Sequence, residues 1–283
     1  MKKLGFSDLK GKVCVITGGA GIIGKAICEA LAANGIITAI IDINLSAAQE
    51  LAQSLSEKYG TLCLGLQANV LDKESLNQVK KVILEKLGKI DFLINGAGGN
   101  SPDATTKIEQ IAKDGEIRVE DTFFGLDLAG FDKVFALNFS GTLLPTMVFA
   151  LDMIRRGEGV ILNISSMNSF RPLTKIPAYS AAKASVNNFT QWLAVHLAKT
   201  GVRVNAIAPG FFLTNQNRFL LVDEKTGKPT ARGEKIMANT PVGKYGQPED
   251  LQGAVLFLLS GLSSFITGVV LPVDGGYSAY GGV

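Results

Sequence analysis

A tyrosine and a lysine four residues apart are the residues of this sequence best suited to acid–base chemistry. Tyr179 and Lys183 stand at the start of a predicted helix, and residues i and i+4 share a helix face. The ammonium can therefore lie beside the phenol, where a positive charge lowers the pKa of a tyrosine from its ordinary value near 10. Ser166 ends an apolar run thirteen residues earlier, and its hydroxyl could hold a substrate oxygen beside the phenol. A Tyr/Lys pair alone is ordinary in helices, so this prediction depends on the other motifs.

A glycine-rich turn follows the first apolar run. Gly18, Gly21 and Gly24 lie between a predicted strand and a predicted helix. Glycines there let the backbone turn tightly and approach a pyrophosphate, while the helix N-terminus offers N–H groups and a positive dipole end. A glycine motif in a strand–turn–helix context predicts a dinucleotide site.

Asp42 ends the second predicted strand, eighteen residues after Gly24. A carboxylate there can accept hydrogen bonds from the adenosine ribose and would repel a 2′-phosphate. Neither the glycine turn nor Ile43 offers a cation for that phosphate, which favours NAD over NADP. The alternative is that Asp42 only caps a turn.

Short apolar runs alternate with longer amphipathic segments along the whole chain. Most of the short runs are continuously apolar, as in strands buried on both faces of a parallel sheet. The pattern predicts a doubly wound α/β fold with a seven-stranded parallel sheet in one domain, residues 1–283. The predicted strands are Val13–Thr17, Ile36–Ile41, Leu62–Gln67, Ile90–Ile94, Val160–Ile164, Val202–Ile207 and Gly268–Val273. The predicted helices are Ile22–Asn34, Ser46–Lys58, Lys73–Leu87, Phe131–Arg155, Ala178–Lys199 and Glu249–Leu259.

Two segments interrupt the alternation, residues 100–130 and 211–240. Both leave from carboxyl ends of predicted strands, where open α/β sheets bind ligands. They are candidate substrate loops, or else solvated surface excursions.

Composition excludes several other classes of function. The net charge of +3, from 28 basic and 25 acidic residues, is too balanced for a nucleic-acid or anionic-membrane surface. One histidine excludes a multi-histidine metal site, and no metal is expected. Cys14, Cys28 and Cys63 lie in apolar stretches and are expected to be buried reduced thiols. No run suits a signal peptide or an 18-residue membrane span, so we expect a cytoplasmic protein.

Taken together, these motifs resemble the short-chain dehydrogenase/reductase family over essentially the whole chain. The matching stretches are the glycine turn, residues 95–98, Asn138, Ser166/Tyr179/Lys183, Pro209-Gly210 and residues 273–276. The resemblance implies a Rossmann-type fold, NAD as cofactor and a tyrosine that gives or takes the proton. It also implies that Lys183 holds the nicotinamide ribose, Asn138 anchors a water in a proton relay, Asn95 stabilises the sheet, and Thr214 binds the carboxamide. The expected cofactor contacts are Gly18, Gly21, Ile23, Gly24, Asp42, Asn69, Val70, Asn95, Ala97, Gly98, Tyr179, Lys183, Pro209, Gly210, Phe212 and Thr214.

Two positions depart from the family pattern. Ile22 stands where the family's usual pattern has a glycine, and Asn69 precedes Val70 where the family commonly has aspartate. An amide can still bond an adenine edge, so neither departure removes the cofactor prediction.

A narrower resemblance, in residues 94–100, 165–170, 205–214 and 274–280, points to D-mannonate oxidoreductases, which interconvert D-fructuronate and D-mannonate with NAD(H). A sugar acid needs a cation for its carboxylate and polar groups for its hydroxyls. Arg218, Asn100 and Asn168 are the first candidates, because a bidentate arginine suits a carboxylate. Arg171, Lys175, Asn215 and Asn217 could contribute, and any of these residues could instead be ordinary surface polarity.

Other interpretations stay open. A gluconate 5-dehydrogenase or related sugar-acid dehydrogenase is the alternative within the enzyme class, and a non-catalytic dinucleotide-binding regulator is the alternative outside it. The intact Ser166/Tyr179/Lys183/Asn138 set argues against the regulator. His196 is assigned a packing or interface role, and the resemblance implies a homotetramer.

Overall fold

Seven parallel strands form the sheet at the centre of the molecule. The computed structural model describes residues 5–113, 117–213, 221–223 and 226–282. The strands lie in the order β3-β2-β1-β4-β5-β6-β7, which confirms the predicted fold class. Every predicted strand is present, with ends shifted by at most two residues. The observed bounds are β1 Val13–Thr17, β2 Ile37–Asp42, β3 Cys63–Gln67, β4 Phe92–Asn95, β5 Gly159–Ile164, β6 Val202–Pro209 and β7 Val270–Val273.

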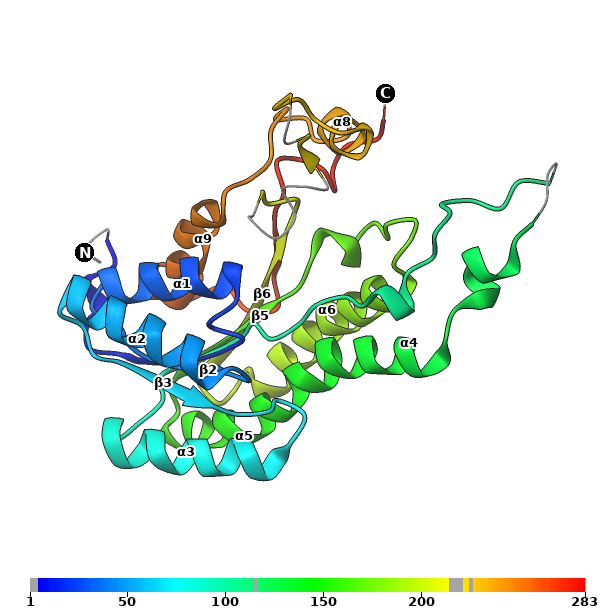
Figure 1. Cartoon of the computed structure of the whole chain (residues 1–283). Helices are drawn as coiled ribbons and strands as arrows, with labels where there is room; N and C mark the ends of the chain where they lie inside the picture. The colour runs from blue at the N-terminus through cyan, green and yellow to red at the C-terminus, as the bar shows by residue number, and fades with distance from the viewer. Residues whose placement is uncertain (1–4, 114–116, 214–220, 224–225, 283) are drawn as a thin grey trace.

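Helices cover both faces of the sheet (Figure 1). On one face lie α1 (Ile22–Ala33), α2 (Leu45–Tyr59) and α9 (Gln252–Leu259), and on the other lie α3 (Lys73–Leu87), α5 (Gly141–Arg156) and α6 (Pro177–Leu197). Successive side chains of a strand point to opposite faces. Cys14 and Ile16 therefore join the core under α1, while Val15 joins the core under α3 and α5. Both faces of the central strands are thus buried, as their continuous apolar runs predict.

Local chemistry explains where the helices begin and end. The side chain of Asn44 accepts a hydrogen bond from Ala47 N at the start of α2, and Asp72 does the same for Glu74 N and Ser75 N at the start of α3. Gly60 ends α2 in the left-handed conformation, with φ at 64°. Cys14, Cys28 and Cys63 are free and buried, as expected.

The predicted helix over residues 131–155 is longer than expected and contains an irregular turn. α4 (Leu128–Phe135) passes through a π-helical turn, Ala136–Ser140, directly into α5. By length and composition, Leu128–Arg156 could span a membrane, which corrects the expectation that no such apolar stretch exists. Half of its most apolar window is buried inside the protein, which is the arrangement of a core helix.

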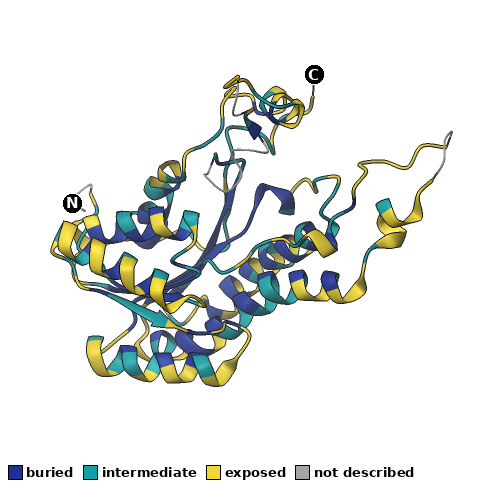
Figure 2. Cartoon of the chain, viewed as in Figure 1, coloured by how far each residue is buried: buried dark blue, intermediate teal, exposed yellow. Residues whose placement is uncertain are grey.

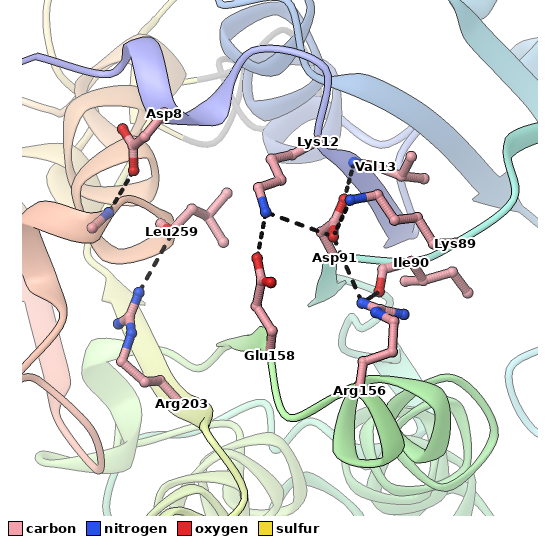
Figure 3. Close-up of polar contacts among 11 residues, drawn as sticks. Asp8, Lys12, Val13, Lys89, Ile90, Asp91, Arg156, Glu158, Arg203 and Leu259 are labelled. Carbon is pink, nitrogen blue, oxygen red and sulfur yellow. Dashed lines mark hydrogen bonds and ion pairs between the residues drawn. The ribbon is translucent and has the colours of Figure 1, made fainter.

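A buried carboxylate ties the amino end of the sheet together (Figure 3). Asp91, only 2% exposed, accepts a hydrogen bond from Val13 N (2.9 Å). Its other oxygen lies 3.1 Å from Lys89 Nζ, 3.6 Å from Arg156 Nη2 and 3.9 Å from Lys12 Nζ. These groups come from β1, the start of β4 and the end of α5. The contacts stabilise the edge of the sheet opposite the strand ends that carry the functional motifs.

Both predicted insertions lie at the carboxyl end of the sheet. The first runs from β4 to α4 and extends away from the body of the molecule (Figures 1 and 2). Ile111, Val119, Phe123, Phe124 and Leu128 are all exposed along it. The second contains α8 (Ala231–Ala238), which packs near the C-terminal segment.

Candidate active site

The strands' carboxyl ends open into a cavity of about 900 Å³. It lies where the chain order reverses between β1 and β4, the position at which doubly wound sheets bind ligands. Most of the predicted cofactor and catalytic residues line it, together with Ile176, which the sequence did not single out. The predicted residues that line it are Gly18, Gly21, Ile23, Gly24, Asp42, Asn69, Val70, Ala97, Gly98, Asn100, Ser166, Tyr179, Lys183, Pro209 and Gly210.

The glycine turn has no room for a side chain at Gly18 or at Gly24. A Cβ at Gly18, whose φ is 63°, would lie 2.8 Å from the Ala97 backbone, and one at Gly24 would lie 2.4 Å from the Gly18 carbonyl oxygen. Gly21 is the N-cap of α1, which begins at Ile22. The departure from the family pattern at Ile22 therefore leaves the helix N-terminus and its N–H groups at the cavity.

Asp42 faces the same turn from the end of β2. One carboxylate oxygen accepts a hydrogen bond from Ala20 N and the other from Asn44 N, both at 3.1 Å. The capping role left open by the sequence is therefore real, and the same carboxylate also lines the cavity. The neighbouring Ile43 is 65% exposed and apolar, so it offers no cation to a phosphate.

Asn69 and Val70, which follow β3, also line the cavity. The side-chain oxygen of Asn69 accepts a hydrogen bond from Leu71 N (3.0 Å), so its amide NH₂ is the group left for a ligand. Val70 is buried beside it.

Tyr179 and Ser166 meet inside the cavity although they come from different elements. Ser166 follows β5, and its side-chain oxygen accepts a hydrogen bond from Asn168 N (3.2 Å) at the start of the turn η6, Met167–Ser169. Tyr179 lies in the first turn of α6. Burial raises the pKa of the Tyr179 phenol, and the hydrogen bond with Ser166 partly offsets this.

Lys183 is buried beside the Tyr179 ring. Its Nζ donates a hydrogen bond to the Ile164 carbonyl oxygen (2.8 Å) and lies 5.6 Å from the centre of the Tyr179 ring. Burial lowers the pKa of Lys183 to about 8. The expectation that Lys183 lowers the pKa of Tyr179 is not met here. The ammonium donates to the carbonyl at the end of β5, and burial is the largest influence on the pKa of the Tyr179 phenol.

Asn138 fixes the loop after β4 from within the π-helical turn. Its Nδ2 donates to the carbonyl oxygens of Gly99 (2.7 Å) and Val134 (2.8 Å), and its Oδ1 accepts from Gly99 N (3.1 Å). A Cβ at Gly98 would lie 2.6 Å from that Oδ1 and 3.2 Å from Lys183 Nζ. The loop therefore packs against both polar side chains. π-Helical turns are frequent at functional sites, and the proton relay assigned to Asn138 stays a prediction.

Asn95 ends β4 and belongs to a buried polar network. Its Nδ2 donates to Thr146 Oγ1 (2.9 Å) and to Asn163 Oδ1 (2.8 Å), and Asn163 Nδ2 donates to Thr190 Oγ1 (2.9 Å). These bonds join β4 and β5 to α5 and α6, which fits the sheet-stabilising role expected of Asn95.

The remaining predicted residues differ in where they lie. Phe212 is buried at a neighbouring cavity of about 230 Å³, next to Gly246. Asn168 is only 5% exposed and does not line the main cavity. Asn100 lines the cavity, and its Nδ2 donates to Thr105 Oγ1 (2.9 Å). Thr214, Asn215, Asn217 and Arg218 fall outside the described residues.

Comparison with known proteins decides the family. Residues 18–278 match a family model described as enoyl-(acyl carrier protein) reductase. An uncharacterized oxidoreductase of Bacillus subtilis, UxuB, is 47% identical over 277 residues, covering 98% of both chains. The chain belongs to the short-chain dehydrogenase/reductase family. It is thus an oxidoreductase of a family that acts on hydroxyl and carbonyl groups, as the motifs predicted.

Two further members of the short-chain dehydrogenase/reductase family are informative. A proposed D-mannonate oxidoreductase from Haemophilus influenzae, solved with NAD bound, superposes with a TM-score of 0.92 at 48% identity, over 98% of this chain and 99% of that one. The 2-dehydro-3-deoxy-D-gluconate 5-dehydrogenase of Dickeya dadantii is 32% identical, over 96% of this chain and 97% of its own.

Proposed function

We propose that this protein uses NAD(H) to interconvert a keto sugar acid and its hydroxy acid, with D-fructuronate and D-mannonate as the pair. The observation that carries the proposal is the joint placement of Ser166, Tyr179 and Lys183 in the cavity that the glycine turn and Asp42 also line. The 48% identity to the proposed D-mannonate oxidoreductase supports the choice of substrate.

The residues of the cavity fit NAD(H). The close-packed glycines at 18 and 24 let the backbone reach a pyrophosphate, and the N-terminus of α1 would hold it. The Asp42 carboxylate would accept hydrogen bonds from the adenosine ribose hydroxyls, and its negative charge would disfavour a 2′-phosphate. When bound, the cofactor supplies or accepts the hydride.

The catalytic side chains supply orientation and the proton. Because burial keeps the pKa of Tyr179 high, the phenol is protonated at neutral pH and suited to give its proton to a carbonyl oxygen. Ser166, which is hydrogen-bonded to it, would hold that oxygen in place. Lys183 would hold the nicotinamide ribose and, when charged, favour the phenolate that results.

Basic side chains near the segment from Ser166 to Ile176 and near the first insertion support an acidic substrate. Arg171 and Lys175 lie within the segment that joins Ser166 to Ile176, and the two end residues of that segment line the cavity. Lys175, Arg232 and Lys235 surround Glu109 of the first insertion, and Lys235 is paired with it. Three cations surround this one carboxylate, which favours an anionic ligand nearby. Arg232 and Lys235 belong to the second insertion, and Glu109, which pairs with Lys235, belongs to the first. This contact supports the proposed role of both insertions as substrate loops.

The groups first named for the substrate carboxylate are partly engaged. Arg171 donates to the Tyr280 carbonyl oxygen, and Lys175 Nζ donates to the Lys107 carbonyl oxygen (2.7 Å). These bonds fasten the C-terminal segment and the first insertion beside the entrance. Arg218, the first candidate, is retained as a proposal.

A related sugar-acid dehydrogenase, such as a gluconate 5-dehydrogenase, is the second candidate. The Dickeya dadantii relative, which is named for oxidation at the 5-position of a sugar acid, favours it. Purified protein should be mixed with D-fructuronate, 5-ketogluconate and neutral keto sugars, and oxidation of NADH and NADPH followed by absorbance. We expect NADH oxidation with D-fructuronate. Turnover of 5-ketogluconate alone would favour the second candidate, and turnover of neutral ketones alone would contradict both.

We also propose that the chain forms a homotetramer. Met147 and Leu151 of α5 and Trp192 and Val195 of α6 present an exposed apolar face. His196 belongs to this face, since its ring stacks on Trp192 with centroids 4.8 Å apart. Sedimentation equilibrium that showed a monomer at micromolar concentration would contradict the proposal.

A further inference from the structure

We propose that Asn187 is a positioning residue that holds Ser166 in register with Tyr179. The inference rests on the catalytic role proposed for Ser166. It concerns a side chain outside the cavity lining, eight residues after Tyr179 on the same helix.

Ser166 and Tyr179 need a link because they are carried by separate elements. Ser166 lies in an extended conformation where β5 gives way to η6, whereas Tyr179 is held by α6. A relative shift of these elements would pull the two hydroxyls apart. Near-attack geometry tolerates little displacement, since a misplacement of about 1 Å can cost about 100-fold in rate.

Asn187 contacts the serine turn on both sides of Ser166. Ser165 Oγ donates a hydrogen bond to Asn187 Oδ1 at 2.5 Å, the shortest distance that the Ser165 hydroxyl makes. Asn187 Nδ2 donates to Ser169 Oγ (2.7 Å). Ser169 Oγ in turn donates to the Ser166 carbonyl oxygen at 2.5 Å. One amide thus holds the residue before Ser166 directly and the Ser166 carbonyl through one hydroxyl.

The periodicity of α6 places Asn187 for this task. Tyr179, Lys183 and Asn187 are spaced four residues apart, so they lie along one face of the helix. Tyr179 gives the proton, and Lys183 binds the Ile164 carbonyl at the end of β5. Asn187 binds the turn that follows β5. Asparagine suits the position because it offers an acceptor to Ser165 and a donor to Ser169 at the same time.

Asn187→Ala removes both contacts, and Asn188→Ala is the matched control, because Asn188 is the next residue of α6 and its side chain is exposed. We expect kcat to fall about 10- to 100-fold in Asn187→Ala, with the NADH dissociation constant unchanged within about twofold. The pH profile of the oxidation direction should also move to higher pH, because the hydrogen bond from Ser166 that lowers the pKa of Tyr179 is weakened. A purely structural role would lower the melting temperature and leave the pH profile in place.

Ser169→Ala provides a second variant that leaves α6 intact. It should reproduce the loss of kcat, and the double variant should lose no more than Asn187→Ala alone, because both changes break one chain of hydrogen bonds. The crystal structure of Asn187→Ala gives a readout that needs no substrate, and we expect the Ser166 hydroxyl to leave the Tyr179 hydroxyl.

The inference is overturned if Asn187→Ala and Ser169→Ala keep wild-type kcat and pH profile, or if Ser166 is not displaced in the crystal. Ser166→Ala separates this failure from failure of the proposed function. Full turnover in Ser166→Ala would refute the catalytic role of Ser166 itself. Loss of turnover in Ser166→Ala together with full turnover in Asn187→Ala would refute only the positioning role of Asn187.

Discussion

The buried ammonium of Lys183 has a measurable consequence for stability. Burial lowers its pKa from 10.5 to about 8. The gap of about 2.5 pH units means that enclosing the charged form costs about 3 kcal/mol. In the unfolded chain Lys183 keeps its proton up to its ordinary pKa of 10.5. Between about pH 8 and pH 10.5 the unfolded state therefore binds more protons than the folded state does. Stability should therefore rise with pH in this window.

The matched variant is Lys183→Met, which keeps a long unbranched side chain without the charge. The stability of the wild type relative to Lys183→Met should increase by about 2 kcal/mol between pH 7 and pH 9.5. Below pH 7 the difference should be constant, because the lysine is charged in both states. Taking the difference between two proteins cancels the titration of groups they share.

Urea denaturation at several pH values, without added cofactor, measures this quantity. Lys81→Met, on the exposed side of α3, controls for the loss of one positive charge at the surface. A difference between wild type and Lys183→Met that stays flat within about 0.5 kcal/mol from pH 7 to pH 9.5 would refute the reasoning, because it would mean that Lys183 keeps its ordinary pKa when buried.

Two further predictions concern the glycine turn and the amino end of the sheet. Gly24→Ala places a Cβ 2.4 Å from the Gly18 carbonyl oxygen and should weaken NADH binding by about tenfold or more, as overpacking costs about 1–3 kcal/mol. Gly253→Ala, in α9 with no atom within 4 Å of the added Cβ, should leave binding unchanged; equal affinities for NADH in fluorescence titrations would contradict the close packing. Asp91→Ala removes the acceptor for Val13 N and the partner of three cations, and should lower the free energy of unfolding by about 3 kcal/mol. A loss below about 1 kcal/mol in urea denaturation would show that this buried carboxylate contributes little.

The fold could be predicted from the sequence because its signals are local. Continuous apolar runs mark the buried strands, and Asn44, Asp72 and Gly60 mark helix ends by their own chemistry. The Tyr179/Lys183 spacing and the glycine turn are likewise short-range patterns. The structure brings them to one cavity because parallel strands present their carboxyl ends at one edge.

What could not be predicted depends on burial and on distant partners. The pKa of Tyr179 is raised rather than lowered, because the depth of its burial and the direction of the Lys183 ammonium are set by tertiary packing. Arg171 and Lys175 bond carbonyl groups 109 and 68 residues away in the sequence. Asn187 carried one usable signal, its spacing of four from Lys183, but its partners lie across the turn after β5.

The central claim is that Tyr179 moves the proton in a reaction that consumes NADH. The direct test compares wild type with Tyr179→Phe, following NADH oxidation by D-fructuronate together with NADH binding by fluorescence. We expect rapid turnover by the wild type and a loss of at least about 100-fold in kcat for Tyr179→Phe, at unchanged affinity for NADH. Turnover by Tyr179→Phe at the wild-type rate would contradict the claim.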